Sequence, residues 1–193
     1  MLRSADNHKP ITPLAFIVCM ALIAATLVFV CGCSGSKQTG IEPGSAFTDS
    51  KDMAIVIDGK AYPVRVDSAG VLQKLGEGYA YEETVSCVYE GYDKSFDYGD
   101  IKVSTVPVDG VDVIEMFTVT GGSYATPRGI KVGDTRQAVL EAYGENYTSD
   151  DGYYITYTQN GDANEFSAMR VMFKMEGDAV TEICVYSPSY TNE

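Results

Sequence analysis

The residue types that most often carry catalysis are scarce in this chain. Its one histidine is His8, close to the N-terminus, so nothing beyond it has an imidazole. Histidine-activated serine or cysteine nucleophiles, histidine-ligated zinc or haem, and an imidazole general base are therefore excluded from the rest of the chain. The sequence also lacks a Gly-x-Ser-x-Gly elbow, a phosphate-binding loop and a dinucleotide fingerprint.

Carboxylates are plentiful, and 27 Asp and Glu residues could support glycosidase chemistry or a calcium site. Nearly all the aspartates, however, stand in turn sequences such as Asp150-Asp151-Gly152, where bonds from a short side chain to nearby backbone explain them without catalysis. Asp93, Asp97 and Asp100 lack the alternate spacing and closing glutamate of an EF-hand loop. We therefore predict that the protein is not an enzyme, has no cofactor and binds no metal.

The N-terminal stretch has the pattern of an export signal. Arg3 and Lys9 precede an apolar run, Leu14 to Val30, that contains no charge. The length of this run also leaves an uncleaved signal anchor as an alternative.

The cysteine at the end of this run carries the strongest chemical signal. The residues Val30-Cys31-Gly32-Cys33 resemble the bacterial lipobox, in which an aliphatic residue and then a small residue precede a cysteine. In that family the cysteine thiol receives a diacylglyceryl group and the signal is removed just upstream. The resemblance implies a lipoprotein signal peptide over residues 1–32 and a lipidated Cys33 that holds the protein on the extracytoplasmic face of the cell membrane.

Two further cysteines, Cys87 and Cys184, lie beyond the lipobox and do not form a metal-type or redox Cys-x-x-Cys pair. They are either a disulfide or two separate thiols. Outside the cytoplasm a disulfide is chemically allowed, and closing so long a loop would stabilise the fold by about 4 to 5 kcal/mol. Both alternatives stay open at this point.

The net charge of −13 limits the partners. Such a surface repels phosphate backbones and anionic headgroups, so we predict no nucleic-acid binding and membrane contact only through the lipid. The charge suits a cationic partner or simple solubility.

Residues 33–50 contain the lipidated cysteine and a stretch rich in Ser, Gly and Thr, which predicts a flexible tether. Two β-type runs, 53–57 and 61–66, then flank Asp58-Gly59, a hairpin turn signal because both central residues need positive φ. A short helix is predicted from Asp67 or Ser68 to Leu75. Further strands are predicted over residues 85–92, 101–107 and 111–119.

The second half repeats this order of elements. A helix is predicted over 135–143, capped by Asp134 with Gln137 in a capping box, and strands follow over 152–158, 169–175 and 179–186. A constant offset of 67 residues matches the two halves, since it carries Asp67 onto Asp134 and Gly110 onto Gly177. We therefore predict two similar units, 51–125 and 126–190, each with a short helix packed on an antiparallel sheet, which is an α+β fold class.

The helix start of the second half carries a family resemblance. Gly133-Asp134-Thr135, followed by Val139-Leu140 and Tyr143-Gly144-Glu145, resembles the helix-start motif of beta-lactamase-inhibitor-protein-like and barrel-assembly-lipoprotein-type domains. The preceding residues 126–132 are similar to a lead-in found in surface lipoproteins of Gram-positive bacteria. The resemblance implies short helices on one face of an antiparallel sheet, and two such units in tandem as in the inhibitor members.

Strand alternation predicts a candidate binding face. If Ile155, Val171, Phe173, Ile183 and Val185 face the helix, period two sends the alternate side chains to the other face. With the constant offset, the residues predicted on that other face are Phe117, Val119, Tyr154, Met172 and Tyr186. A face with tyrosine and methionine is either the seam between the two units or a partner-binding surface.

These observations predict a membrane-anchored extracytoplasmic lipoprotein that acts as a non-catalytic binding or adaptor module. Its partner would be a protein or a cell-envelope component. The alternative function, implied by the family resemblance alone, is inhibition of a secreted or envelope enzyme.

Overall fold

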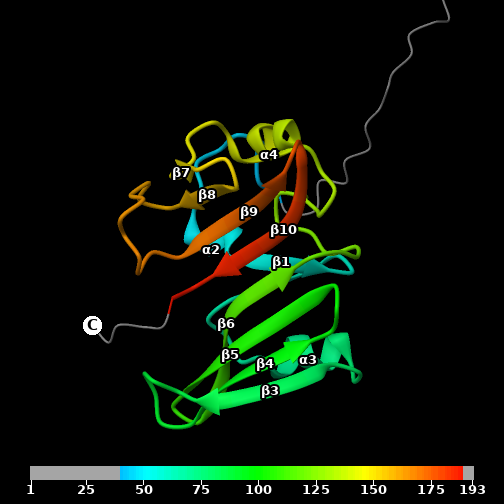
Figure 1. The fold of residues 1–193 in the computed structure, drawn as a ribbon, viewed down its shortest axis with the longest axis vertical. Coiled ribbons are helices and arrows are strands. Elements are labelled where there is room, and N and C mark those ends of the chain that lie inside the picture. Colours follow the sequence, from blue (N-terminus) through cyan, green and yellow to red (C-terminus); the bar gives the residue numbers. More distant parts are fainter. Residues whose placement is uncertain (1–39, 189–193) are drawn as a thin grey trace, which may run out of the picture. The chain divides into compact units, whose positions relative to one another are not determined.

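The computed structural model describes residues 40–188 (Figure 1). The predicted signal peptide, Cys33 and the first part of the predicted tether lie outside these residues. Strands dominate the described part, and helices make up only about 13% of it. The predicted α+β fold class is therefore wrong, and the fold is mostly β.

The helices are too short to form a layer of their own. Helix α3 spans Ala69–Leu75 and helix α4 spans Arg136–Tyr143, so each makes about two turns. Gly76 and Gly144 end them, both with φ of 82°, a backbone conformation that glycine adopts without steric cost. The positions of α3 and α4 agree with the sequence prediction. Their share of the structure, however, is too small for the predicted fold class.

Eight antiparallel strands form the main sheet, in the order β3-β4-β5-β6-β10-β9-β8-β7. It consists of two up-and-down halves, β3–β6 and β7–β10, which meet edge to edge where β6 pairs with β10 (Figure 1). A separate hairpin pairs β1 with β2. The strands are β1 Ala54–Ile57, β2 Lys60–Pro63, β3 Ala80–Val85, β4 Tyr92–Asp97, β5 Ile101–Val108, β6 Val111–Val119, β7 Ser149–Asp150, β8 Tyr154–Thr158, β9 Arg170–Glu176 and β10 Ala179–Tyr186.

The structure confirms the predicted turn between β1 and β2 and contradicts one predicted strand. Asp58 and Gly59 join β1 to β2 with φ of 47° and 79°, which confirms the turn. The strand predicted over 85–92 is wrong, because most of this segment is the loop between β3 and β4, where Ser86 N donates to Gly91 O at 3.0 Å. Its apolar residues cover no core; Val85 and Val88 are exposed.

The last part of the predicted tether packs on the fold. Gly44 N donates to Ala142 O in α4 at 3.0 Å, and Phe47 is buried. A single helical turn, α2 Asp49–Asp52, follows. Composition alone suggested flexibility here, but these residues bond to the backbone of α4 and to the Arg128 side chain, so the tether ends before residue 44.

A buried ion pair fixes this N-terminal segment. The side chains of Arg128 and Asp52 are 3% and 0% exposed, and Arg128 Nε lies 2.6 Å from Asp52 Oδ1. Arg128 also donates to Asp52 Oδ2 and to the carbonyl oxygens of Ser45, Ala46 and Ala142. All five N–H donors of the guanidinium are thereby used, so one side chain joins the N-terminal segment to α4.

One face of the main sheet packs on α3, α4 and the β1–β2 hairpin, and β1 and α2 lie behind the sheet in Figure 1. The buried cluster includes Val71 of α3, Val139 and Tyr143 of α4 and Ile55 of β1. The sheet contributes the large side chains Phe117, Tyr157, Phe173 and Ile183. We call the opposite side of the sheet the open face.

The two cysteines of the described part are free thiols. Cys87 is exposed in the β3–β4 loop, whereas Cys184 is buried in β10. Strands β5 and β6 separate β10 from β4, so the two sulfurs belong to different halves of the sheet. The disulfide alternative is therefore wrong in this structure.

Across residues 40–188, we find no helix with the length and apolar character that crossing a membrane requires.

Candidate functional site

The open face carries a row of three interface-type side chains on neighbouring strands. Tyr186 of β10 lies opposite Met116 of β6 on one side and Arg170 of β9 on the other. The next residues on the same face of the sheet are Cys184 and its partner Met172. All except Cys184 are half-buried, so they are both held in place and accessible.

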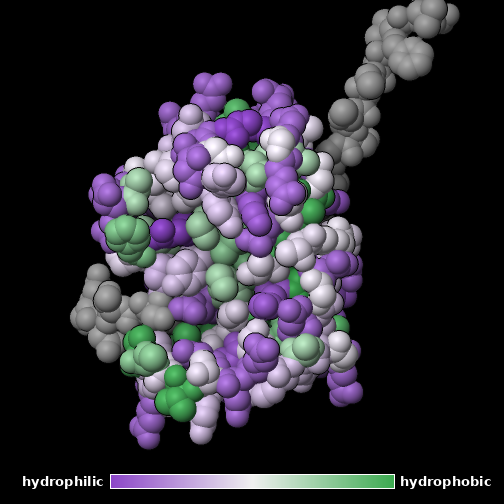
Figure 2. Space-filling view, in the orientation of Figure 1, coloured by the Kyte–Doolittle hydropathy of each residue, from purple (hydrophilic) through white to green (hydrophobic). Residues whose placement is uncertain are grey.

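Figure 2 looks at this face. Hydrophilic residues cover most of it, and some hydrophobic ones are grouped among them near the middle. Protein interfaces commonly have an apolar centre surrounded by a polar rim, and the open face has this mixture.

Three of the five residues predicted for the binding face lie on it. Tyr154, Met172 and Tyr186 are half-buried, while the residues that alternate with them in the strands, such as Ile155 and Phe173, are fully buried. The alternative that this face is a seam between two units is wrong, because the halves join through the edges of β6 and β10.

The other two predicted residues, Phe117 and Val119, belong to the core. Both are 0% exposed and pair with the buried Val185 and Ile183 of β10. Their placement on the binding face is therefore wrong. Met116, one residue away, takes the predicted place.

The cause of this error is the offset itself. The turn Asp109-Gly110 joins β5 to β6 and the turn Gly177-Asp178 joins β9 to β10, so the two hairpins are 68 residues apart and not 67. Each hairpin has one β-bulge before the residues in question, and the two extra residues cancel. A displacement of one residue moves every side chain to the other face of a strand.

Burial keeps two titratable groups of the open face in their neutral forms. Burial raises the pKa of the Cys184 thiol to about 12, so it stays protonated and is a poor nucleophile at neutral pH. Burial also raises the pKa of Tyr186, and the nearby charge of Glu115 adds to this rise. The face therefore offers neutral hydrogen-bonding groups together with the positive charge of Arg170.

A loop beside the open face presents an exposed aromatic side chain. Arg170 donates from Nε to Ala168 O at 3.1 Å and from Nη2 to the carbonyl oxygens of Glu165 and Phe166 at 2.9 and 2.8 Å. These bonds hold the loop next to the row, and Phe166 is 77% exposed. Strand periodicity could not find Phe166, because it lies outside the strands.

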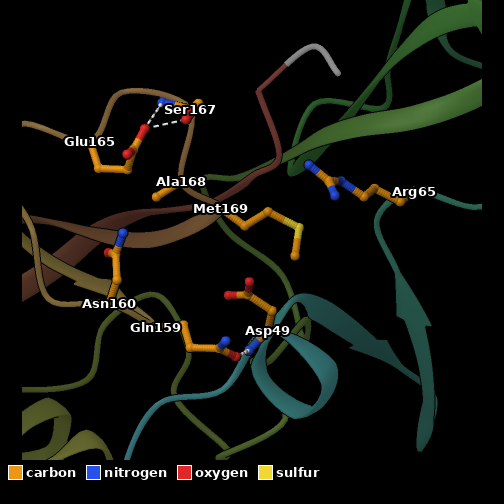
Figure 3. Close-up of a pocket in the computed structure, with 8 residues that line it drawn as sticks. All are labelled: Asp49, Arg65, Gln159, Asn160, Glu165, Ser167, Ala168 and Met169. Carbon is orange, nitrogen blue, oxygen red and sulfur yellow. Dashed lines mark hydrogen bonds between the residues drawn. The ribbon is translucent and has the colours of Figure 1, made fainter. Parts of the chain in front are cut away.

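A polar hollow of about 270 Å³, the junction pocket, lies between α2, Arg65 and the β8–β9 loop (Figure 3). The Asp49 carboxylate and the side chains of Asn160 and Met169 point towards its middle. Burial raises the pKa of Asp49, and the positive charge of Arg65 acts against that rise. The pocket is lined by Asp49, Arg65, Gln159, Asn160, Glu165, Ser167, Ala168 and Met169.

Several polar groups of the junction pocket have hydrogen-bond partners within the protein. Gln159 Oε1 accepts a bond from Asp49 N at 3.0 Å, and Glu165 accepts from Ser167. Arg65 Nε donates to Ser187 Oγ at 2.6 Å. Within residues 40–188, His, Cys, Asp and Glu side chains nowhere gather in a group of three that could hold a metal ion.

No protein-family model matches the chain, and no curated protein or solved structure is detectably similar to it.

Proposed function

We propose that this chain is a lipid-anchored extracytoplasmic protein that binds a partner protein or a cell-envelope component through its open face, without catalysis. The anchor rests on the lipobox-like residues around Cys33. The observation that carries the binding proposal is the cross-strand row of Met116, Tyr186 and Arg170 on the sheet face opposite to the helices and the β1–β2 hairpin.

The composition of this row supports binding. Tyrosine, methionine and arginine are enriched in the centres of protein interfaces, and tyrosine and arginine are frequent among the residues that dominate binding energy. Because the three side chains project from adjacent strands, they lose little conformational freedom when a partner docks.

Crosslinking and pull-down from intact cells, with the full chain as bait, tests the binding face. The double variant Met116→Ala/Tyr186→Ala should reduce capture of the specific partner by about tenfold or more, because each central side chain contributes on the order of 1 to 2 kcal/mol. Tyr153→Ala is the matched control, since Tyr153 is 70% exposed in the turn before β8. Equal capture by both variants would contradict the use of the open face.

Mass spectrometry of Cys33 tests the anchor separately. We expect a diacylglyceryl group on its sulfur, and we expect Cys33→Ala to be released from the membrane or retained with its signal. An unmodified Cys33 in a membrane-bound protein would instead support the uncleaved signal anchor.

The exposed Phe166 loop favours inhibition of a secreted or envelope enzyme as a second candidate function. An inhibitor needs an aromatic or acidic loop that can enter an active site, and Glu165-Phe166 is such a loop, held from behind by Arg170. Assays of the chain against a panel of β-lactamases and secreted peptidases test this function. Inhibition that Phe166→Ala removes would support it, and the absence of inhibition across the panel would end it.

A further inference from the structure

The junction pocket is lined by side chains of both charges. Asp49 and Arg65 line it, and the positive charge of Arg65 acts on the Asp49 carboxyl. The volume of about 270 Å³ lies below the roughly 300 to 1,000 Å³ of pockets that hold drug-sized molecules. A ligand of this hollow would therefore be a small molecule with polar groups.

The Asp49 carboxylate has a buried oxygen without a partner. Its Oδ1 makes no hydrogen bond, and burial raises the pKa of the carboxyl. Buried polar atoms in folded proteins are nearly always hydrogen-bonded, so this oxygen is an exception. The carboxylate points towards the middle of the hollow in Figure 3. Because its two oxygens share one charge, an ammonium group on the hollow side would compensate the whole carboxylate.

The other carboxylate of the hollow already has donors. Glu165 Oε1 accepts hydrogen bonds from Ser167 N and from Ser167 Oγ. The hollow therefore presents the Asp49 carboxylate to a cation. A bare metal ion fits poorly, because the cationic Arg65 lines the same small space.

Donor groups line the hollow beside Asp49. Gln159 Oε1 accepts the bond from Asp49 N, and Asn160 Oδ1 accepts a bond from Asp162 N. Both amides thus use their oxygens within the protein, which leaves their NH2 groups to donate to a ligand. Arg65 lies across the hollow from Asn160 in Figure 3 and adds a positive charge. These groups suit an anionic acceptor such as a carboxylate.

Met169 gives the hollow an apolar part. Its side chain extends towards the middle of the hollow and packs against the core (Figure 3). The flexible thioether adapts to apolar groups of different shape. A neutral polyol could use the same donors, but it would leave the charge of Asp49 without compensation. A ligand with an ammonium group, a carboxylate and a small apolar group would satisfy all three parts.

We propose that the junction pocket binds a small α-amino acid with an apolar side chain. The ammonium group of the ligand pairs with the Asp49 carboxylate. The NH2 groups of Gln159 and Asn160 donate to the ligand carboxylate, and the charge of Arg65 favours the same group. The apolar side chain of the ligand lies against Met169.

The pocket and the open face lie on different sides of the sheet. Met169 packs against the core, whereas the next residue, Arg170, belongs to the row of the open face. Helix α2, which carries Asp49, lies behind the sheet in Figure 1. The inference therefore does not depend on the proposed function. Arg170 also holds the loop of the pocket through backbone bonds, so the test leaves Arg170 unchanged.

Isothermal titration calorimetry of the full chain in detergent micelles tests the ligand class. The probes are leucine and alanine, each as both enantiomers, and at least one should bind with a Kd below about 1 mM. The amide of that amino acid keeps the ammonium group but lacks the carboxylate. Its N-acetyl derivative keeps the carboxylate but lacks the ammonium group. Both derivatives should bind at least about tenfold more weakly, because each loses one charged contact.

Two variants of unchanged side-chain size test the site. Asp49→Asn removes the charge that pairs with the ammonium group. Asn160→Asp keeps the oxygen that accepts from Asp162 N but places a negative charge beside the ligand carboxylate. Each variant should weaken binding by about tenfold. Asp49→Asn should leave Tm unchanged or raise it, because Oδ1 has no hydrogen bond to lose.

The matched controls make the same charge changes outside the pocket. Asp109→Asn lies in the turn between β5 and β6, and Asn164→Asp lies at an exposed position of the β8–β9 loop. Both should bind the amino acid as the unchanged chain does. Circular dichroism checks that all four variants are folded.

Three outcomes would overturn the inference. The first is the absence of binding by all four amino-acid probes. The second is equal binding of the amino acid and its two derivatives, which would mean that neither charged group is recognised. The third is equal binding by Asp49→Asn and Asp109→Asn, which would place the ligand outside the junction pocket.

Discussion

The two halves of the sheet share one order of elements but are stabilised differently. In each half a short helix precedes four antiparallel strands, and the last two strands form a hairpin with a bulge. The half that ends in β10 is tied to the N-terminal segment by a buried ion pair and holds a buried aromatic cluster. The half that begins with β3 has a fully exposed edge strand.

This difference indicates a division of roles within one fold. The second half is fixed to the N-terminal segment of the described residues, because Arg128 bonds both to that segment and to α4. The first half is free of that constraint and presents its edge. The predictions that follow compare matched positions in the two halves, beginning with the largest expected difference.

Breaking an ion pair should have very different costs in the two halves. Arg128→Ala leaves the buried carboxylate of Asp52 without its partner, and we expect it to lower the free energy of unfolding by about 3 to 5 kcal/mol. Lys74→Ala breaks the exposed ion pair of Lys74 with Asp58 and should have a much smaller effect, because solvent screens the two charges. Urea denaturation measures both. Similar losses would show that Arg128 does not anchor the fold.

Removing an aromatic ring should also cost more in the second half. Phe173 packs against Tyr143 and Tyr157 and is 0% exposed, whereas Phe96 packs against Tyr79 and Tyr81, which are partly exposed. We expect Phe173→Ala to destabilise the protein by about 3 to 5 kcal/mol and Phe96→Ala by roughly 1 to 2 kcal/mol less, because surface rings can close over the gap. Thermal and urea unfolding measure both losses of stability. A larger loss for Phe96→Ala would contradict this expectation.

The helix caps provide a smaller comparison. Thr135 Oγ1 accepts a hydrogen bond from Ala138 N at 3.2 Å at the start of α4, whereas the Ser68 side chain makes no such bond at the start of α3. Thr135→Ala should therefore cost about 1 kcal/mol of unfolding free energy and Ser68→Ala about half or less. Equal losses in urea titrations would show that the observed cap bond contributes little.

The sequence predicted the local elements well where a short pattern determines them. The hairpins β5–β6 and β9–β10 and both helices lie close to their predicted ranges, because strand alternation and glycine stops depend on neighbouring residues. The predicted cap at Asp134 is displaced by one residue, since Thr135 caps α4 and Asp134 accepts a bond from Lys131 N instead.

Features that join distant residues could not be read from these patterns. Arg128 and Asp52 are 76 residues apart, and nothing local marks Asp52 as the partner of a buried guanidinium. Phe117 pairs with Val185 of β10, and no local pattern marks this pairing between the two halves. The sheet face of the predicted residues was therefore correct only in the half whose strand phase was read directly, at Tyr154, Met172 and Tyr186.

The smallest expected effect is on stability at acid pH, and it has the same sign in both halves. Hydrogen bonds from backbone N–H groups lower the pKa of Asp97, through Gly99, and of Asp151, through Tyr154 and Tyr153. A folded-state pKa below the unfolded one contributes stability above the unfolded pKa, near 4, and this stability is lost as the pH falls through the folded pKa. Asp97→Asn and Asp151→Asn should each flatten the acid limb of a stability-against-pH curve.

High salt should change the acid response of Asp97 but not that of Asp151, which makes this last comparison sharper. Part of the lowered pKa of Asp97 comes from Lys102, whose Nζ lies 3.3 Å from its carboxylate, whereas the shift of Asp151 arises from backbone donors alone. At about 1 M NaCl an exposed ion pair is screened but a direct backbone hydrogen bond is retained. The flattening caused by Asp97→Asn should therefore shrink in high salt, while that caused by Asp151→Asn should persist. The opposite order would mean that the charge of Lys102 does not contribute to the lowered pKa of Asp97.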